Sequence, residues 1–268
     1  MAKVIVVSNE KGGVAKTTTA EVFAAELHRR KYRVLAIDLD PQGDLSSCSK
    51  AKVDDEVYTS LELLTNKAPV QNIIQQLPRF DIIPSDKTLS TAPSKMPAIG
   101  KEYSLKKAIA PILNDYDYII IDTPPSLDAL TINAFTCANE VIIPSMAGIF
   151  SVKGVSNLNT VLQEVREYYN PIVHIDGILI TMYSPNINVR KSLKEVTEKI
   201  AEVIHTRVYD TYIRSTSVVE VCQANQQDLI DSCGDCTAAC DYKRFVSEYL
   251  NLHREEKSSE TEAERTVS

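Results

Sequence analysis

Residues 4–21 read VIVVSNEKGGVAKTTTAE, an apolar run followed by a glycine pair and then a helical pattern. When a strand, a loop and a helix follow in this order, backbone N–H groups and the helix N-terminus can bind phosphate oxygens. The motif G-x-x-x-x-G-K-[ST] is met only in part, because Glu10 and Ala15 replace its two glycines. Lys16 and Thr17 keep its essential pair. The sequence therefore predicts a phosphate-binding loop, with an Ala15 backbone that needs no positive φ.

The residue types of this loop indicate its ligand. A lysine placed as Lys16 is reaches the β and γ phosphates of a nucleotide, and the Thr17 hydroxyl is an oxygen ligand of the kind that Mg²⁺ prefers. Thr18 is expected to assist at the α-phosphate. A plain strand-turn-helix with a surface lysine explains neither the glycine pair nor the Lys-Thr pair. We therefore predict a site for a nucleotide with Mg²⁺.

Outside the loop, strand and helix patterns alternate along the 268 residues. Short β-branched runs predict strands at residues 3–8, 33–38, 118–122, 140–144 and 176–181, with a shorter one at 81–84. Helical spacing predicts helices at residues 17–30, 57–64, 104–114, 152–169, 189–205 and 237–250. Alternation of this kind is typical of an α/β domain whose mostly parallel sheet has helices on both faces.

Three aspartates stand at the ends of predicted strands. Asp38 and Asp40 lie in VLAIDLDPQ, and their spacing of two places both carboxylates on one side of the chain. Asp122 ends the run YIIID, the place of a carboxylate that binds Mg²⁺ through water. Aspartates before a proline are also common turn residues, and the Pro-Pro pair after Asp122 is also a helix-start signal. Both interpretations of these segments stay open on the residues alone.

The segment KGGVAKTTT resembles the deviant Walker A motif, K-G-G-x-x-K-[ST], of the ParA/MinD family of ATPases. The likeness extends over residues 1–252 and is greatest to ParA/Soj-like members; it implies a P-loop NTPase three-layer sandwich. By this resemblance Lys11 reaches the phosphates of a partner subunit, Asp40 orients the attacking water, and Asp38 lies near the Mg²⁺ shell. The segment at Thr181 would lie near the base. The implied ATP-binding residues are Lys11, Gly12, Gly13, Val14, Ala15, Lys16, Thr17 and Thr18.

The resemblance also implies partners: a homodimer when ATP is bound, non-specific DNA and a ParB-like activator, in partition of a plasmid, chromosome or mobile element. The implied DNA-binding residues are Arg190, Lys191, Lys194 and Arg214. A net charge of −7 excludes a protein coated in positive potential, so any DNA contact must come from a local patch. These residues also fit plain solvated helix surface, and the segment IRSTSVVEVCQ lacks basic residues that many relatives carry.

Two other functions are consistent with the loop. The segment CGDCTAAC, with Cys222 upstream, has spacing that could hold zinc or an iron-sulfur cluster, as in Mrp-type cluster carrier ATPases. Buried or incidental thiols are the plainer interpretation of Cys222, Cys233, Cys236 and Cys240. A MinD-like positioning ATPase would end in a basic amphipathic helix, whereas residues 253–268 are polar and rich in glutamate. We predict no membrane binding, a cytoplasmic protein that can associate with the nucleoid, a disordered tail at 253–268, and no role for His253.

Overall fold

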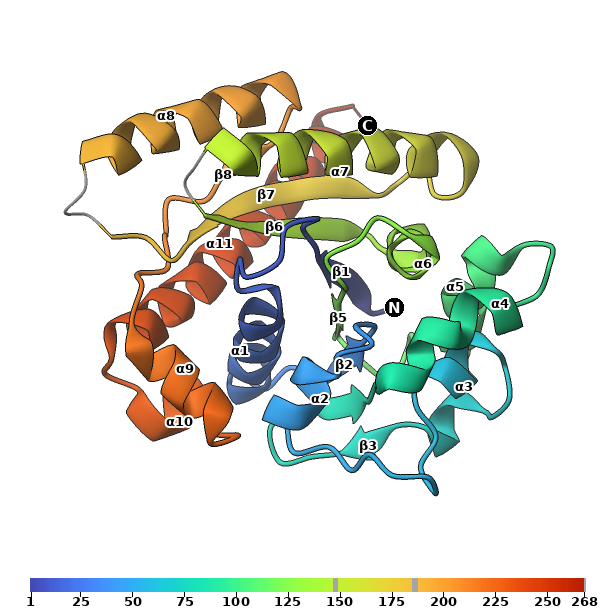
Figure 1. Cartoon of the computed structure of the whole chain (residues 1–268). Coiled ribbons are helices and arrows are strands. Elements are labelled where there is room, and N and C mark those ends of the chain that lie inside the picture. Colours follow the sequence, from blue (N-terminus) through green and yellow to red (C-terminus); the bar gives the residue numbers. More distant parts are fainter. Residues whose placement is uncertain (147–148, 185–187, 268) are drawn as a thin grey trace.

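Eight strands form one sheet in the computed structural model, and helices cover both of its faces (Figure 1). The strand order is β3-β4-β2-β5-β1-β6-β7-β8, and the β3–β4 pair alone is antiparallel among the described pairings. The structure describes the backbone of residues 1–146, 149–184 and 188–267, and the side chains of residues 1–146, 153–184 and 195–255. The strands are β1 (Lys3–Val7), β2 (Val34–Asp38), β3 (Gln75–Gln76), β4 (Asp81–Ile83), β5 (Tyr118–Asp122), β6 (Glu140–Met146), β7 (His174–Thr181) and β8 (Arg207–Val208).

The helices divide between two hydrophobic cores, one on each face of the sheet. One core receives side chains from α3 (Ser60–Leu64), α4 (Ala92–Lys95), α5 (Ser104–Ile109), α6 (Ala129–Cys137), α7 (Ile149–Tyr168) and α8 (Asn188–Val203). The other receives them from α1 (Lys16–Arg29), α2 (Asp44–Cys48), α9 (Ser217–Ala224), α10 (Leu229–Cys233) and α11 (Thr237–Val267). Figure 1 shows α7 and α8 on one side of β6 and β7, with α1 and α11 on the other.

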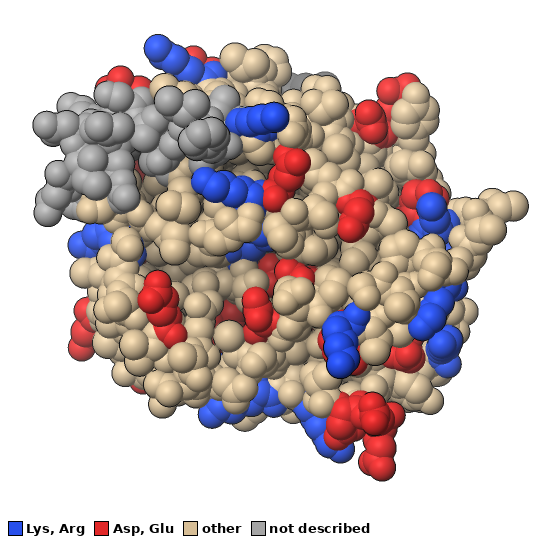
Figure 2. Space-filling view, in the orientation of Figure 1, with Lys and Arg blue, Asp and Glu red and all other residues tan. Residues whose placement is uncertain are grey.

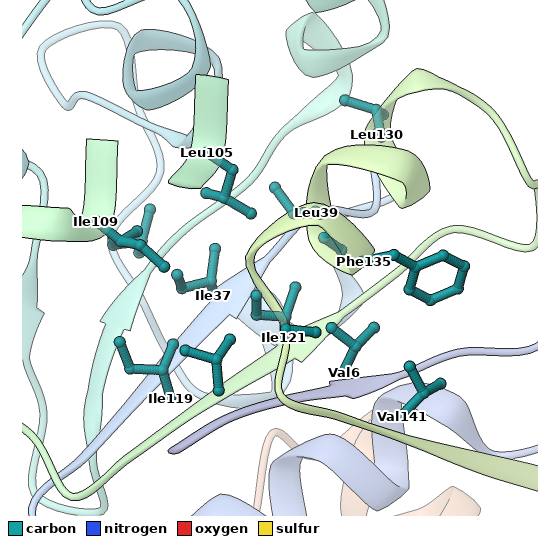
Figure 3. Close-up of a cluster of buried hydrophobic side chains, with 14 of the residues drawn as sticks. Val6, Ile37, Leu39, Leu105, Ile109, Ile119, Ile121, Leu130, Phe135 and Val141 are labelled. Atoms are coloured by element: carbon teal, nitrogen blue, oxygen red, sulfur yellow. The ribbon is translucent and has the colours of Figure 1, made fainter. Parts of the chain in front are cut away.

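Alternation along the strands explains why both faces are apolar. In β1, Val4 and Val6 belong to the first core, while Ile5 and Val7 belong to the second. A strand buried on both faces must be apolar at every position, which is the pattern the sequence shows. In the first core, Val6 lies among side chains from β2, β5, α5 and α6 (Figure 3).

The predicted α/β fold is confirmed, and the five long predicted strands match β1, β2, β5, β6 and β7 to within two residues. The predicted helix at 104–114 is too long. Helix α5 ends at Ile109 and a 3₁₀ turn follows at Ala110–Ile112, because Pro111 cannot continue the α-helical hydrogen bonding. The two-residue strands β3 and β8 were not predicted, because two residues are too few to show the alternation of apolar and polar side chains that indicates a strand.

The folded part of the chain extends past the boundary predicted at residue 252. His253 is packed against the sheet, with 11% of its side chain exposed. The backbone of α11 continues as helix to Val267, through the segment predicted to be disordered. The ion pairs of His253, described below, hold residue 253 against the sheet, and the disordered tail otherwise stays a prediction. Among the described residues, no helix combines the length and the apolar content that crossing a bilayer requires.

Candidate functional site

The predicted phosphate-binding loop leads from the end of β1 into the start of α1. Gly13 and Ala15 both have positive φ, at 70° and 63°, and Ala15 is the N-cap residue of α1. The expectation for Ala15 was therefore wrong. The left-handed conformation costs an alanine about 1 kcal/mol, and backbone strain of this size is typical of ligand-binding loops held by their surroundings.

Buried side chains outside the motif hold this loop in place. The Asn9 carboxamide accepts a hydrogen bond from the Lys11 N–H (3.0 Å) and donates one to the Pro144 carbonyl at the end of β6 (2.8 Å). From the end of β7, the Thr181 hydroxyl donates to the Val14 carbonyl (3.0 Å). The neighbouring strands thus fix the loop backbone on both sides. Thr181, which the resemblance placed near the base, contacts the loop itself.

Lys16 begins α1 and is 7% exposed. Its Nζ donates a hydrogen bond to the Lys11 carbonyl at 3.0 Å, so the ammonium group folds back over the loop. Burial lowers the pKa of Lys16, and the nearby carboxylates Asp122 and Asp40 oppose that change. A buried ammonium with few partners is well prepared to bind an anion that enters the loop.

Asp122, at the end of β5, is fully buried. Neither of its carboxylate oxygens makes a hydrogen bond to the described residues. Burial raises its pKa well above the usual range, with the Asp38 charge adding to the rise and the nearby Thr17 hydroxyl opposing it. Because a buried carboxylate without partners is costly, this arrangement fits a hydrated divalent cation between Thr17 and Asp122.

Asp38 and Asp40 lie in different surroundings, although their spacing predicted that both carboxylates lie on one side of the chain. Asp38 is fully buried, and its oxygens accept hydrogen bonds from the Ser46 N–H (2.9 Å), the Ser46 hydroxyl (2.7 Å) and the Asp40 N–H (3.0 Å). Burial raises the pKa of Asp38, and the hydrogen bonds from Ser46 oppose that rise. Asp40 instead lines the cavity described next and accepts a hydrogen bond from the Gln42 N–H (2.9 Å). Of the two, Asp40 is the one placed to contact a ligand.

A cavity of ≈ 450 Å³ opens beside the loop, at the carboxyl ends of the strands. Parallel α/β sheets commonly bind ligands at this edge. Six predicted ligand-binding residues line it together with Asp40: Gly12, Gly13, Ala15, Lys16, Thr17 and Thr18. Its far wall comes from residues after β7 and from α9 and α11: Met182, Ile213, Arg214, Ser215, Thr216, Val219, Glu220, Gln223 and Tyr242. Lys11, Val14, Asp38 and Asp122 are not among the lining residues.

The far wall is tied to the loop by hydrogen bonds that the sequence did not predict. Gln223 on α9 donates to the Thr18 hydroxyl at 2.7 Å, and the Tyr242 hydroxyl on α11 lies 3.1 Å from the Thr19 hydroxyl. These contacts place α9 and α11 against the first turn of α1. The sequence held one indication of these contacts. Tyr242 places a polar hydroxyl at a position of α11 that is otherwise apolar.

Comparison with known proteins identifies the family. A family model described as AAA domain matches residues 2–175. The chain is 37% identical to the sporulation initiation inhibitor protein Soj of Bacillus subtilis over 219 residues, 80% of this chain and 84% of that protein. It is 32% identical to the chromosome partitioning protein ParA of Caulobacter vibrioides over 260 residues, 94% of this chain and 96% of that protein. The chain is a ParA/Soj-like member of the ParA/MinD family.

The fold of this ParA-like chain is also similar to a solved structure with nucleotide. That structure is cobyrinic acid a,c-diamide synthase from Mycobacterium smegmatis with bound ATP analogue and magnesium. The TM-score is 0.81 at 28% identity, over 95% of this chain and 96% of that one. The α/β P-loop architecture is therefore confirmed.

The four basic residues proposed for DNA do not form one described patch. Arg190, Lys191 and Lys194 belong to α8, and their side chains lie outside the described residues. Arg214 forms a two-pronged ion pair with the buried Asp241, with both N···O distances at 2.8 Å. On the face shown in Figure 2, described basic side chains are interspersed with acidic ones. In this ParA-like chain, the ion pair of Arg214 with Asp241 thus links the far wall of the cavity to α11.

Four of the six cysteines of this ParA-like chain lie on α9, α10 and the N-terminal end of α11. Cys222 is buried on α9, while Cys233, Cys236 and Cys240 are half-buried. Among the described residues, one group has its ligand atoms close enough together to hold a metal ion, and it consists of Glu140, Asp176 and His253. The four cysteines therefore do not form a ready-made metal site in the described part of the chain.

Proposed function

We propose that this chain is an ATPase that uses Mg-ATP to form a homodimer and acts in partitioning DNA. The observation that carries the proposal is the fully buried Asp122, whose oxygens lack hydrogen bonds beside Lys16 and Thr17. A fold does not keep an unpaired carboxylate next to a strained anion-binding loop without a ligand to offset its cost. The family names, chromosome partitioning protein ParA and Soj, support the cellular task.

Each residue of the site has a chemical role in this proposal. The loop N–H groups and the Lys16 ammonium bind the phosphates, and the Thr18 hydroxyl, held by Gln223, assists at the α-phosphate. Thr17 and Asp122, with Asp38 behind them, would hold Mg²⁺, which supplies positive charge to the transferring phosphoryl group. Asp40, 8% exposed in the cavity wall, positions a water molecule for attack.

The role of Lys11 is to complete the site of the partner subunit. Its carbonyl accepts the Lys16 hydrogen bond, while its side chain is absent from the described lining of its own cavity. Two loops that face each other across a two-fold axis would place each Lys11 against the other subunit's phosphates. ATP then contributes contacts to the dimer interface that ADP lacks, so hydrolysis separates the subunits.

Variants of the two lysines test this proposal. We expect Lys16→Ala to abolish ATP binding, because it removes the buried cation of the loop. Lys11→Ala should bind ATP within about threefold of the wild type yet remain a monomer, so hydrolysis should fall by about 10²-fold. Calorimetry measures binding, sedimentation measures association, and phosphate release measures turnover.

Lys31→Ala is the matched control, since Lys31 is an exposed lysine at the other end of α1. It should behave as wild type in all three assays. An ATP-bound dimer of Lys11→Ala would overturn the role of Lys11 in the partner's site. Magnesium-independent binding of ATP by the wild type, with no hydrolysis, would overturn the ATPase proposal itself.

The same dimer is proposed to bind non-specific DNA in the cytoplasm and to be triggered by a ParB-like activator. We expect ATP-dependent binding to a long duplex that weakens steeply with salt, because phosphate contacts release counterions. Arg190→Ala or Lys194→Ala should reduce affinity about tenfold and lower the salt slope by about one per residue. Fluorescence anisotropy across salt concentrations measures both quantities.

Arg214 needs a different experiment from the α8 residues. Its loss would leave Asp241 with fewer partners in the core, so Arg214→Ala should destabilise the fold by about 2 kcal/mol whatever its effect on DNA. Asp235→Ala, which removes an exposed charge, is the control for binding. Equal DNA binding by the ATP, ADP and nucleotide-free forms would rule out a nucleotide-gated DNA switch.

A further inference from the structure

The segment Cys233-Gly234-Asp235-Cys236 forms a tight turn between α10 and α11. The Cys236 N–H donates to the Cys233 carbonyl at 2.9 Å, which closes the turn over four residues. Gly234 has no room for a side chain, because a Cβ there would lie 2.7 Å from the Ile230 carbonyl oxygen. A larger residue at position 234 would therefore have to displace the Ile230 backbone, so glycine fits this tight turn.

This geometry meets the requirement for a disulfide. In a turn closed in this way the first and fourth Cα atoms lie within about 7 Å, and a disulfide needs roughly 4.4 to 6.8 Å between its Cα atoms. The two side chains are neighbours, because the Cys233 thiol is one of the groups that raise the pKa of Cys236, after burial. The closed turn thus holds the two residues in the range of separation that a disulfide needs.

Backbone donors at the start of α11 point at one of the two sulfurs. Cys236 is the residue before Thr237, the first residue of α11. Its sulfur lies near the Ala239 and Ala238 N–H groups, at the position of an N-cap side chain. Burial raises the pKa of Cys236, and these two N–H groups oppose that rise. A thiolate formed at Cys236 would be stabilised there by the helix N-terminus.

We propose that Cys233 and Cys236 form a redox-active dithiol that is oxidised to an intramolecular disulfide by low-molecular-weight disulfides. The Cys236 thiolate attacks one sulfur of the oxidant RSSR, which releases RS⁻ and leaves a mixed disulfide on Cys236. The Cys233 thiolate then attacks the Cys236 sulfur and releases the second RS⁻. Two cysteine thiols lose two electrons and two protons, and RSSR is reduced to two RSH.

The position of the pair connects it to the nucleotide cavity. One turn further along α11, Asp241 holds Arg214 of the cavity wall, and Tyr242 contacts Thr19 of α1. Cys222 lies on α9, one position before the Gln223 that holds Thr18, and burial together with the nearby Cys236 and Cys233 raises the pKa of Cys222. Oxidation would therefore occur where α9 and α11 meet the first turn of α1.

The full-length wild-type protein gives the first test of the proposal. It is reduced, then equilibrated at pH 8 with oxidised and reduced glutathione at graded ratios, quenched with acid and alkylated. Cleavage before aspartate, which cuts at Asp231, Asp235 and Asp241, separates the two cysteines. We expect loss of two of the six thiols and a disulfide that joins peptide 231–234 to peptide 235–240, and fragmentation of the linked peptides should place the bond on Cys236 and the alkyl group on Cys240. Cys233→Ser should instead keep one glutathione per chain, on Cys236.

Cys48→Ser is the matched control, because Cys48 is also half-buried but lies on α2. It should lose the same two thiols at the same ratio as the wild type. The proposal is overturned if all six thiols survive conditions that oxidise the urea-unfolded chain. It is also overturned if the linked peptides contain Cys222 or Cys240 in place of the pair, or if purified protein retains stoichiometric zinc that blocks the oxidation.

Discussion

Asp122→Asn should reduce ATP hydrolysis by at least about 100-fold and at the same time make the nucleotide-free protein more stable, by about 1–2 kcal/mol. The two effects have one cause. Asp122 is fully buried and its oxygens have no hydrogen bond to the described residues, so its charge costs folding free energy until a cation reaches it. An asparagine keeps the shape and removes the charge. Urea unfolding of the nucleotide-free protein and a phosphate-release assay measure the two quantities.

Binding of nucleotide and magnesium should make the wild type more stable than the Asp122→Asn variant. Mg-ATP binds the folded wild type and raises its melting temperature by mass action, whereas Asp122→Asn should gain little from magnesium. Asp55→Asn provides the comparison, because Asp55 is exposed and far along the chain from the loop. It should change neither stability nor turnover. A less stable Asp122→Asn protein that still hydrolyses ATP would show that Asp122 is a structural carboxylate.

The phosphate loop and the sheet could be predicted because their signals are local. The pattern of residues 4–21 contains the strand, the glycine pair and the helix start within one short stretch, and β2 and β5 are apolar runs that end in aspartate. The conformation of Ala15 was mispredicted for a physical reason. Its positive φ is imposed by the surrounding contacts, among them the Thr181 hydrogen bond to Val14. Intrinsic preference, which sequence reasoning uses, is overridden there.

The rest of the site depends on contacts between distant residues. Gln223 reaches Thr18 and Tyr242 reaches Thr19 across more than 200 positions of sequence. Asn9 is adjacent to the motif, yet its role is visible only once β6 brings the Pro144 carbonyl to it. Neither hydrophobic periodicity nor motif spacing in a sequence indicates such contacts between distant residues. Asp38 shows the same limit, because the sequence did not predict the hydrogen bonds that it accepts from Ser46.

His253→Ala should lower the free energy of unfolding by about 3 kcal/mol at pH 7, the cost of leaving buried charges without a partner. The His253 Nε2 lies 2.9 Å from Glu140 of β6 and 3.1 Å from Asp176 of β7, while Nδ1 lies 2.7 Å from the Tyr249 carbonyl. Both ring nitrogens thus face acceptors, which requires the doubly protonated, charged imidazole. Chemical denaturation at several pH values measures the effect.

Other charged and ionisable groups around this cluster must be considered with His253. Lys3 forms an ion pair with Glu140, and His174 lies 3.9 Å from the same carboxylate. The Tyr249 hydroxyl donates to Glu140, and the Tyr209 hydroxyl donates to Asp176. Arg207 lies 3.8 Å from Asp176. Lys3 and Arg207 are thus two further basic side chains beside these carboxylates.

The pH dependence follows from the shifted pKa of His253. Burial alone would lower that pKa, but hydrogen bonds to Asp176 and Glu140 outweigh burial and raise it from 6.5 to about 10. Because the folded state holds the proton more tightly, the stabilisation is fully present below pH 6.5 and is lost as the pH rises through about 10. Wild-type stability should therefore fall between these values, and the His253→Ala protein should lack that part of the slope.

His28→Ala is the control, because His28 is an exposed histidine on α1. It should leave both the stability at pH 7 and the slope unchanged. A His253→Gln variant separates charge from packing, since glutamine can donate a hydrogen bond to one carboxylate but carries no charge. It should recover part of the stability at pH 7 and none of the pH dependence. If His253→Gln keeps the wild-type slope, the titrating group belongs to another residue of the cluster.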